Sequence, residues 1–141
     1  MRPQKGIAVD SYCINGNPGD CGFRAIDLDT CEILFQYKIT GKCTNGIVEF
    51  LALVKGVQYL INNNRLEDKI YSYSDTALAW YRNGKHKSKL PLSTETEVAL
   101  NQLQIAFSHI PTSNKMNYVE FWNNKEWGQI TTGYKKKSAH Q

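Results

Sequence analysis

The stretch "TNGIVEFLALVKGVQYLINN", from Thr44 to Asn63, decides the fold class of this 141-residue chain. Its apolar residues recur at helical spacing: Ile47, Phe50, Leu51, Val54, Val57 and Leu60. Thr44 or Asn45 can cap its first turn. The segments before this helix have strand patterns, whereas those after it alternate between strand and helix. This order predicts an α/β fold in which helices pack on a mixed sheet.

Three strand candidates precede the helix. They are "KGIAVDSYCI" (residues 5–14), "CGFRAIDLDT" (21–30) and "EILFQYKIT" (32–40). Between the first two, "GNPGD" is strong turn chemistry, because Gly frees the backbone and Pro fixes it. The three strands therefore predict an antiparallel meander.

Strands and helices alternate in the second half of the chain. "KIYSYS" (69–74) predicts a fourth strand, and "DTALAWYRNG" (75–84) predicts a short helix with Asp75 as its N-cap. A further helix is expected over residues 90–110, where Thr94 and Glu97 have capping-box spacing. Its apolar side would comprise Val98, Leu100, Leu103, Ile105 and Phe107. "NYVEFWN" (117–123) predicts a fifth strand.

Length and composition favour one domain. We expect it to span residues 1–137, with a frayed tail over residues 138–141. No apolar run is long enough to cross a bilayer, and the N-terminal stretch is a poor signal peptide. A cytoplasmic protein with no membrane association and no obligate protein partner is therefore expected. The four cysteines (Cys13, Cys21, Cys31 and Cys43) form no CxxC pair, so we expect reduced thiols rather than a zinc site.

The formal net charge is +4, a surplus that permits a polyanionic partner without showing one. Basic residues cluster in "RNGKHKSK" (82–89) and "YKKK" (134–137). Solvated surface is the ordinary reading of such runs. Aromatic side chains lie close to both of them, which keeps nucleic acid open as a partner.

Three acidic residues stand out by position. Asp10 lies within the first strand, Glu49 lies on the first turns of an apolar helix, and Asp75 lies at the exit of the fourth strand. Each has an ordinary structural explanation as an edge residue, a first-turn charge or a cap. If the three converged, they would stay ionised together only around a cation. Hard oxygen ligands of this kind suit magnesium or manganese and phosphoryl-transfer chemistry.

The chain resembles the type 1 ribonuclease H family, in particular its bacterial branch that lacks a histidine-rich loop. Four collinear motifs carry the resemblance: "AVDSYCINGNPG", "GKCTNGIVEFLALVKGVQYL", "IYSYSDTALAWYRNGK" and "FWNNKEWGQITTGYKKK". The resemblance covers Gly6 to about Lys137. It implies a five-stranded mixed sheet with helices packed on both faces.

The resemblance also implies an activity. Family members hydrolyse the RNA strand of RNA–DNA hybrids with two divalent ions held by four acids. Asn17, Thr44 and Asn45 match positions that contact the hybrid, although turn and cap chemistry explains them equally well. Lys85, Lys87 and Lys89 are candidates for phosphate contacts.

The departures from the family pattern bear on activity. The family's "TNN" is "TNG" here, so Gly46 replaces a residue expected to contact the minor groove. Laid without a gap, the third catalytic acid falls on Tyr73; a two-residue deletion would place it on Asp75. The position of the last acid is Gly133. Sequence alone leaves the choice between Tyr73 and Asp75 open.

The leading hypothesis is therefore a weakened, magnesium- or manganese-dependent endonuclease with Asp10, Glu49 and Asp75 as catalytic residues and metal ligands. The alternative is a catalytically inactive module of the same fold that binds hybrid or duplex nucleic acid. A protein-interaction scaffold that kept only the core is a third possibility.

Overall fold

The computed structural model describes residues 3–16, 18–65, 67–83, 93–108, 118–128 and 130, without the side chains of Ala99, Leu103, Ala106 and Phe107. Some of the residues discussed above lie outside this description: Asn17, Lys85, Lys87, Lys89 and Gly133. In the described part of the chain, no helix is both long enough and apolar enough to cross a membrane.

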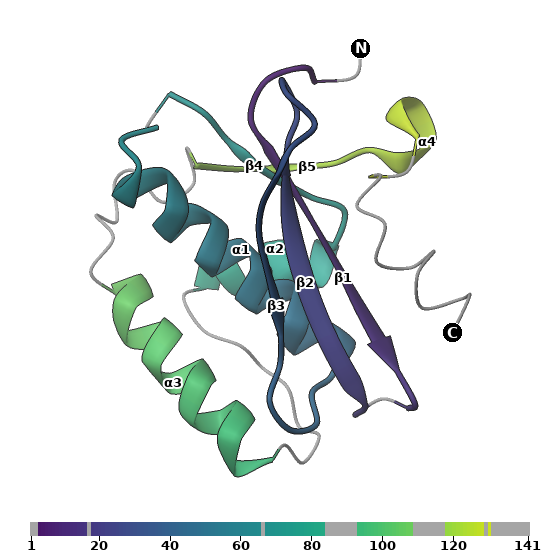
Figure 1. Ribbon diagram of the computed structural model, residues 1–141, viewed down its shortest axis with the longest axis vertical. Helices are drawn as coiled ribbons and strands as arrows, with labels where there is room; N and C mark the ends of the chain where they lie inside the picture. The colour runs from purple at the N-terminus through teal and green to yellow at the C-terminus, as the bar shows by residue number, and fades with distance from the viewer. Residues whose placement is uncertain are drawn as a thin grey trace.

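One five-stranded mixed sheet forms the centre of the molecule, in the order β3-β2-β1-β4-β5 (Figure 1). The strands are β1 (Ile7–Ile14), β2 (Asp20–Asp27), β3 (Ile33–Lys38), β4 (Ile70–Ser72) and β5 (Val119–Phe121). The first three pair antiparallel, and β4 and β5 continue the sheet in parallel with β1. The predicted meander and the predicted mixed sheet are confirmed.

Helices cover both faces of the sheet, as predicted. They are α1 (Asn45–Asn62), α2 (Asp75–Asn83), α3 (Thr94–Ser108) and the short α4 (Asn124–Trp127). Figure 1 shows α1 and α3 on one side of the strands and α4 on the other. On the first face the main core packs α1 against Ile7, Val9 and Phe23. On the opposite face a smaller cluster joins Ala8, Tyr71 and Trp122 to Trp127 of α4.

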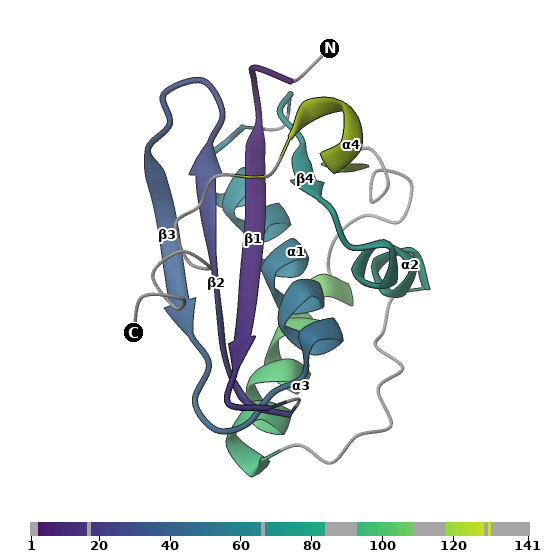
Figure 2. The ribbon, with the colours of Figure 1, turned by 90° about the vertical axis from the view of Figure 1, so that its right-hand side faces the viewer.

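The helix α1 occupies the middle of the packing, between the sheet and the helices α2 and α3 (Figure 2). Thr44 is its N-cap, because the Thr44 Oγ1 accepts a hydrogen bond from the Ile47 N–H at 3.2 Å. Ten of its residues are buried, and these include the apolar positions whose spacing predicted the helix. The sequence pattern of this segment therefore reflects the sheet and helices that surround it.

The predicted N-caps of the next two helices, Asp75 and Thr94, are each wrong by one residue. The cap of α2 is Ser74, whose Oγ accepts from the Ala77 N–H at 3.0 Å, and Asp75 is the first helical residue. The cap of α3 is Ser93, whose Oγ accepts from the Thr96 N–H at 3.2 Å. In both places two residues that can cap stand side by side, and the first one takes the role.

The predicted apolar side of α3 is also partly wrong. Leu100 is buried, but Val98 and Ile105 are exposed. The buried polar residue Thr96 lies in their place, because its hydroxyl bonds with the carbonyl oxygens of Thr40 and Lys42 at 3.0 and 2.9 Å. A polar anchor therefore fixes the start of α3 against the segment that leads into α1.

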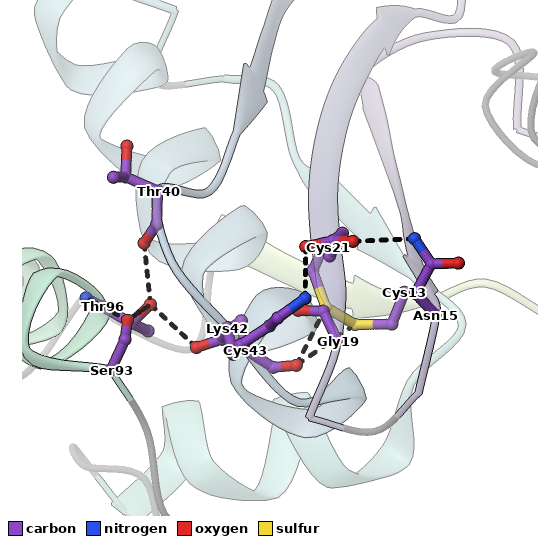
Figure 3. A network of polar contacts seen from close by, with 10 residues as sticks. Cys13, Asn15, Gly19, Cys21, Thr40, Lys42, Cys43, Ser93 and Thr96 are labelled. Atoms are coloured by element: carbon purple, nitrogen blue, oxygen red, sulfur yellow. Dashed lines mark hydrogen bonds and ion pairs between the residues drawn. A yellow bond between two sulfur atoms is a disulfide. The ribbon is translucent and has the colours of Figure 1, made fainter.

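The expectation of four reduced cysteines is corrected by a disulfide between Cys13 and Cys21. These residues are opposite each other in the β1–β2 register, which brings their side chains together. The Cys21 Sγ lies 3.1 Å from the Cys43 carbonyl oxygen, and Cys43 forms a two-way backbone bridge with Gly19 (Figure 3). The β1–β2 turn is thereby tied to the residue that precedes the cap of α1.

We predict that a maleimide added to the native, unreduced protein labels Cys31 alone. Cys31 is exposed, whereas Cys43 is a buried thiol whose pKa burial raises to about 12. Mass spectrometry should count one label natively and a second after denaturation without reductant. The Cys31→Ser variant is the control and should take no label natively. Labelling of all four cysteines after denaturation without reductant would contradict the disulfide.

Candidate functional site

The site lies where β1 and β4 separate. The two strands pair only at Ile7–Ile70 and Ala8–Tyr71, after which β1 continues to Ile14 and β4 ends at Ser72. The strands are parallel, so this opening is at their carboxyl ends, the usual place for ligands in open α/β sheets. The helix α1 runs beside both strands and brings Glu49 to the opening.

Asp10 and Glu49 come together here, although they are far apart in the sequence. Both line one small gap, which is completed by Val9, Ser11, Ala52, Ser72 and Tyr73. Asp10 is only 6% exposed, and one of its carboxylate oxygens accepts from the Ser11 N–H at 2.9 Å. The gap has no room for a water-sized group in this structure. Two of the three predicted acids are thus neighbours in a closed site.

Asp75 does not join them. Its side chain is exposed on the first turn of α2, and it is not among the residues that line the gap. Within the described ranges, no group of three His, Cys, Asp or Glu side chains is placed to hold a metal ion. The described structure thus brings Asp10 and Glu49 together and leaves Asp75 apart from them, while the role of Asp75 as a ligand stays a prediction. The exposed charge of Asp75 is explained by the helix dipole, which favours an acid at this end.

Tyr73 stands at the gap instead of a third acid. It follows β4 directly, lines the gap, and packs against the cluster that contains Ala8, Tyr71 and Trp122. A phenol thus stands where a further carboxylate would be needed to complete a set of acids at the gap. The structure therefore puts an aromatic ring at the position that the gapless alignment indicates.

A buried arginine lies beside the same carboxylate. Arg24 on β2 is directly opposite Asp10 in the register and is 6% exposed. Opposite residues of an antiparallel pair point to the same face, with their Cβ atoms about 5 Å apart. Asp10 and Arg24 therefore lie on the same face of the sheet, on neighbouring strands. Arg24 was not predicted from the sequence, although a basic residue inside an otherwise buried strand can be recognised there.

Two serines at the end of β4 complete the polar contacts. The Ser74 hydroxyl donates to the Glu49 Oε1 at 3.1 Å, and the Ser74 N–H donates to the Ser72 Oγ at 3.2 Å. Both serines are buried. Sequence analysis also missed these residues, although polar side chains at the end of a buried strand are themselves a signal.

These residues fit a divalent ion only in part. The Asp10 and Glu49 carboxylates are the hard oxygen ligands that magnesium and manganese prefer. Against this, the gap is closed, and Tyr73 and Arg24 supply neither charge nor oxygen of the needed kind. The donor set is therefore suited to one weakly held ion and does not fit a pair of ions held by four acids.

Two of the residues expected to contact a hybrid, Thr44 and Asn45, lie at the start of α1. Thr44 is buried and its hydroxyl caps the helix, whereas Asn45 is exposed at the first helical position. The neighbouring turn is held by Asp20, which accepts from the Asn15 Nδ2 at 2.8 Å and pairs with the Lys42 Nζ at 2.9 Å. These two contacts, first the one from Asn15, lower the pKa of Asp20. The Asp20 carboxylate is thus paired within the turn that lies beside the start of α1.

Gly46 has a packing role in addition to being a departure from the family pattern. A Cβ at Gly46 would lie 2.8 Å from the Cη2 atom of Trp80, which is too close for a carbon–carbon contact. The Trp80 ring of α2 therefore covers the first turn of α1, and it makes an edge-on contact with Phe50 at 6.2 Å. Gly at this position and Trp at residue 80 depend on each other.

The sequence matches no protein-family model. Among solved structures, the chain is similar to the N-terminal RNase H domain of a Mycobacterium tuberculosis protein, solved as a fusion with maltose-binding protein. The identity is 18%, the TM-score is 0.51, and the match covers 96% of this chain and 97% of that one. The fold is that of a ribonuclease H domain.

Two further ribonuclease H structures resemble the chain more loosely. An RNase H1 isolated from compost by a metagenomic approach has 18% identity and a TM-score of 0.49, covering 98% of this chain and 92% of that chain. RNase H1 from the halophilic archaeon Halobacterium salinarum has 15% identity and a TM-score of 0.42, covering 83% and 80%.

We predict that Gly46→Ala destabilises the protein by about 1–3 kcal/mol, because the new methyl group overpacks against Trp80. In a Trp80→Leu background the same change should be neutral or stabilising, since the clash is gone and Ala is the better helix residue. Urea unfolding of the four proteins of this cycle measures the coupling. Equal effects in both backgrounds would contradict the contact.

Proposed function

We propose that the chain is a ribonuclease H-like endonuclease that acts on the RNA strand of RNA–DNA hybrids, with a site reduced to Asp10 and Glu49. The observation that carries this proposal is the meeting of these two carboxylates at the carboxyl ends of β1 and β4. Asp10 is nearly buried, a costly place for a charge that has no function. The ribonuclease H fold supports the same reading.

Asp10 and Glu49 would hold the divalent ion, magnesium or manganese, which when bound activates water for attack on a phosphodiester. Fewer carboxylates mean weaker binding, because each one offsets part of the cost of dehydrating the ion. Manganese gives up water more readily than magnesium and is the expected preference. The exposed Asn45 and the turn at residues 15–20 would approach the hybrid, where the 2′-hydroxyls distinguish RNA from DNA.

The proposal predicts slow cleavage of the RNA strand of a labelled hybrid in manganese. Asp10→Asn should abolish it, since this change removes one of two charges at the gap. Asp75→Asn should leave the rate unchanged, because Asp75 is exposed and outside the gap. Gel analysis of the cleaved strand measures all three proteins under one condition.

Each variant can contradict the proposal in its own way. Cutting that survives Asp10→Asn would place the activity elsewhere or in a contaminant. A large loss with Asp75→Asn would make Asp75 a ligand despite its position on α2.

Tyr73 and Arg24 favour a second candidate function, a module that binds the hybrid without cutting it. Tyr73 lines the gap, and Arg24 is opposite Asp10 in the register of β1 and β2, on the same face of the sheet. Such a module would bind hybrids with an affinity that falls steeply with salt, as phosphate contacts require. Hybrid binding by the wild type with no cleavage in manganese would favour this second function over the first.

Tyr73→Asp should raise manganese affinity and the cleavage rate together. This change puts a third carboxylate beside Asp10 and Glu49 and removes the ring that helps to close the gap. Tyr73→Ser is the matched control, because it opens the gap without adding charge. Calorimetric titration with manganese and hybrid cleavage are the measurements. A gain with Ser as large as that with Asp would show that space, rather than charge, limits the site.

A further inference from the structure

Ser74 connects the end of β4, the start of α2 and the candidate acid site. It is 7% exposed. Its carbonyl oxygen accepts from the Leu78 N–H at 3.1 Å, and its Oγ accepts from the Ala77 N–H at 3.0 Å. The same Oγ lies 3.1 Å from the Glu49 Oε1. One side chain therefore serves both the helix and the carboxylate.

The direction of the Ser74 hydroxyl hydrogen follows from these contacts. A hydroxyl has one hydrogen to donate, and its oxygen can accept as well. Because the oxygen already accepts from the Ala77 N–H, the hydrogen is left for the Glu49 carboxylate. A hydrogen bond to a charged group is stronger than a neutral one, and this bond is partly buried.

We propose that Ser74 is a positioning residue that holds Glu49 in the orientation needed at the gap, through the hydrogen bond to its Oε1. This inference rests on the proposed function. Ser74 itself touches neither the substrate nor the ion. It fixes Glu49 because its own place is fixed twice, by the cap of α2 and by the bond from its N–H to Ser72.

If Ser74 were only the cap of α2, its contact with the Ala77 N–H would be explained, but its hydrogen bond to Glu49 would have no role. The two roles can be separated, because Gly and Asn are both accepted at an N-cap and only Asn has a donor to offer Glu49. Ser93 provides a matched control, since it caps α3 in the same way with its Oγ 3.2 Å from the Thr96 nitrogen. No residue in the described part of α3 lines the gap.

The experiment compares the wild type with Ser74→Gly, Ser74→Asn and Ser93→Gly. Ser74→Gly should lower kcat on a labelled hybrid about tenfold, with KM unchanged, because a charged hydrogen bond at the reacting centre is lost. Manganese affinity, followed by the electron-spin-resonance signal of the free ion, should fall as well. Ser74→Asn should restore most of both losses. Ser93→Gly should change neither, and circular dichroism verifies that all four proteins are folded.

Three results would overturn the proposal: full kcat and manganese affinity in Ser74→Gly, no rescue by Asn in a folded protein, or equal losses in Ser93→Gly. Absence of cleavage by the wild type would instead count against the proposed function. In that case manganese affinity alone decides the role of Ser74. Wild-type binding that Ser74→Gly weakens supports it, and no binding by the wild type overturns it.

Discussion

The separation of β1 from β4 is the constraint on which the rest of the site depends. Their ladder stops after Ala8 and Tyr71, and only beyond this point can a side chain of α1 enter between the strands. The helix α1 must lie close to the sheet for the Glu49 side chain to reach the gap between β1 and β4. Gly56 permits this approach, since a Cβ there would be 3.0 Å from the Ile70 Cδ1. Ala52, which lines the gap, is small for the same reason.

Charge balance then decides what the opening can do. Two carboxylates that line one gap repel each other unless something offsets their charges. Arg24 is opposite Asp10 in the register of β1 and β2, and the Ser74 hydroxyl donates to the Glu49 carboxylate. A metal ion at the proposed site would therefore act beside polar groups that the protein itself supplies.

Most of the fold could be predicted from the sequence, because each element has a strong local pattern. The meander, α1 and the fifth strand follow from periodicity and turn chemistry alone. What failed depends on contacts between distant segments. Ser74 and Ser93 cap their helices in place of Asp75 and Thr94, and no local rule ranks neighbouring residues that can all cap. Thr96 lies on the inner side of α3, where apolar residues were predicted, because its hydroxyl bonds with the carbonyl oxygens of Thr40 and Lys42.

The site shows the same division. Asp10 and Glu49 could be singled out from the sequence, because a charged residue inside an apolar segment is easy to recognise. Arg24 has the same signal and was not singled out. The sequence could not show whether Asp75 reaches the site. A two-residue shift of the alignment at the end of β4 decides whether Asp75 or the aromatic Tyr73 takes the third position. The disulfide was missed for a related reason: Cys13 and Cys21 become partners only through the register of β1 and β2.

The contact between α1 and α2 joins the proposed acid site to the surface at which a nucleic acid is expected. The start of α1 carries Asn45 and, one turn later, Glu49, while α2 carries Ser74 at its cap and Trp80 on its inner side. Trp80 lies against Gly46, and Ser74 binds Glu49, so α2 contacts α1 both at the expected nucleic-acid surface and at the acid site. A shift of α2 would therefore alter both together. The packing of these two helices explains why residue 46 is a glycine.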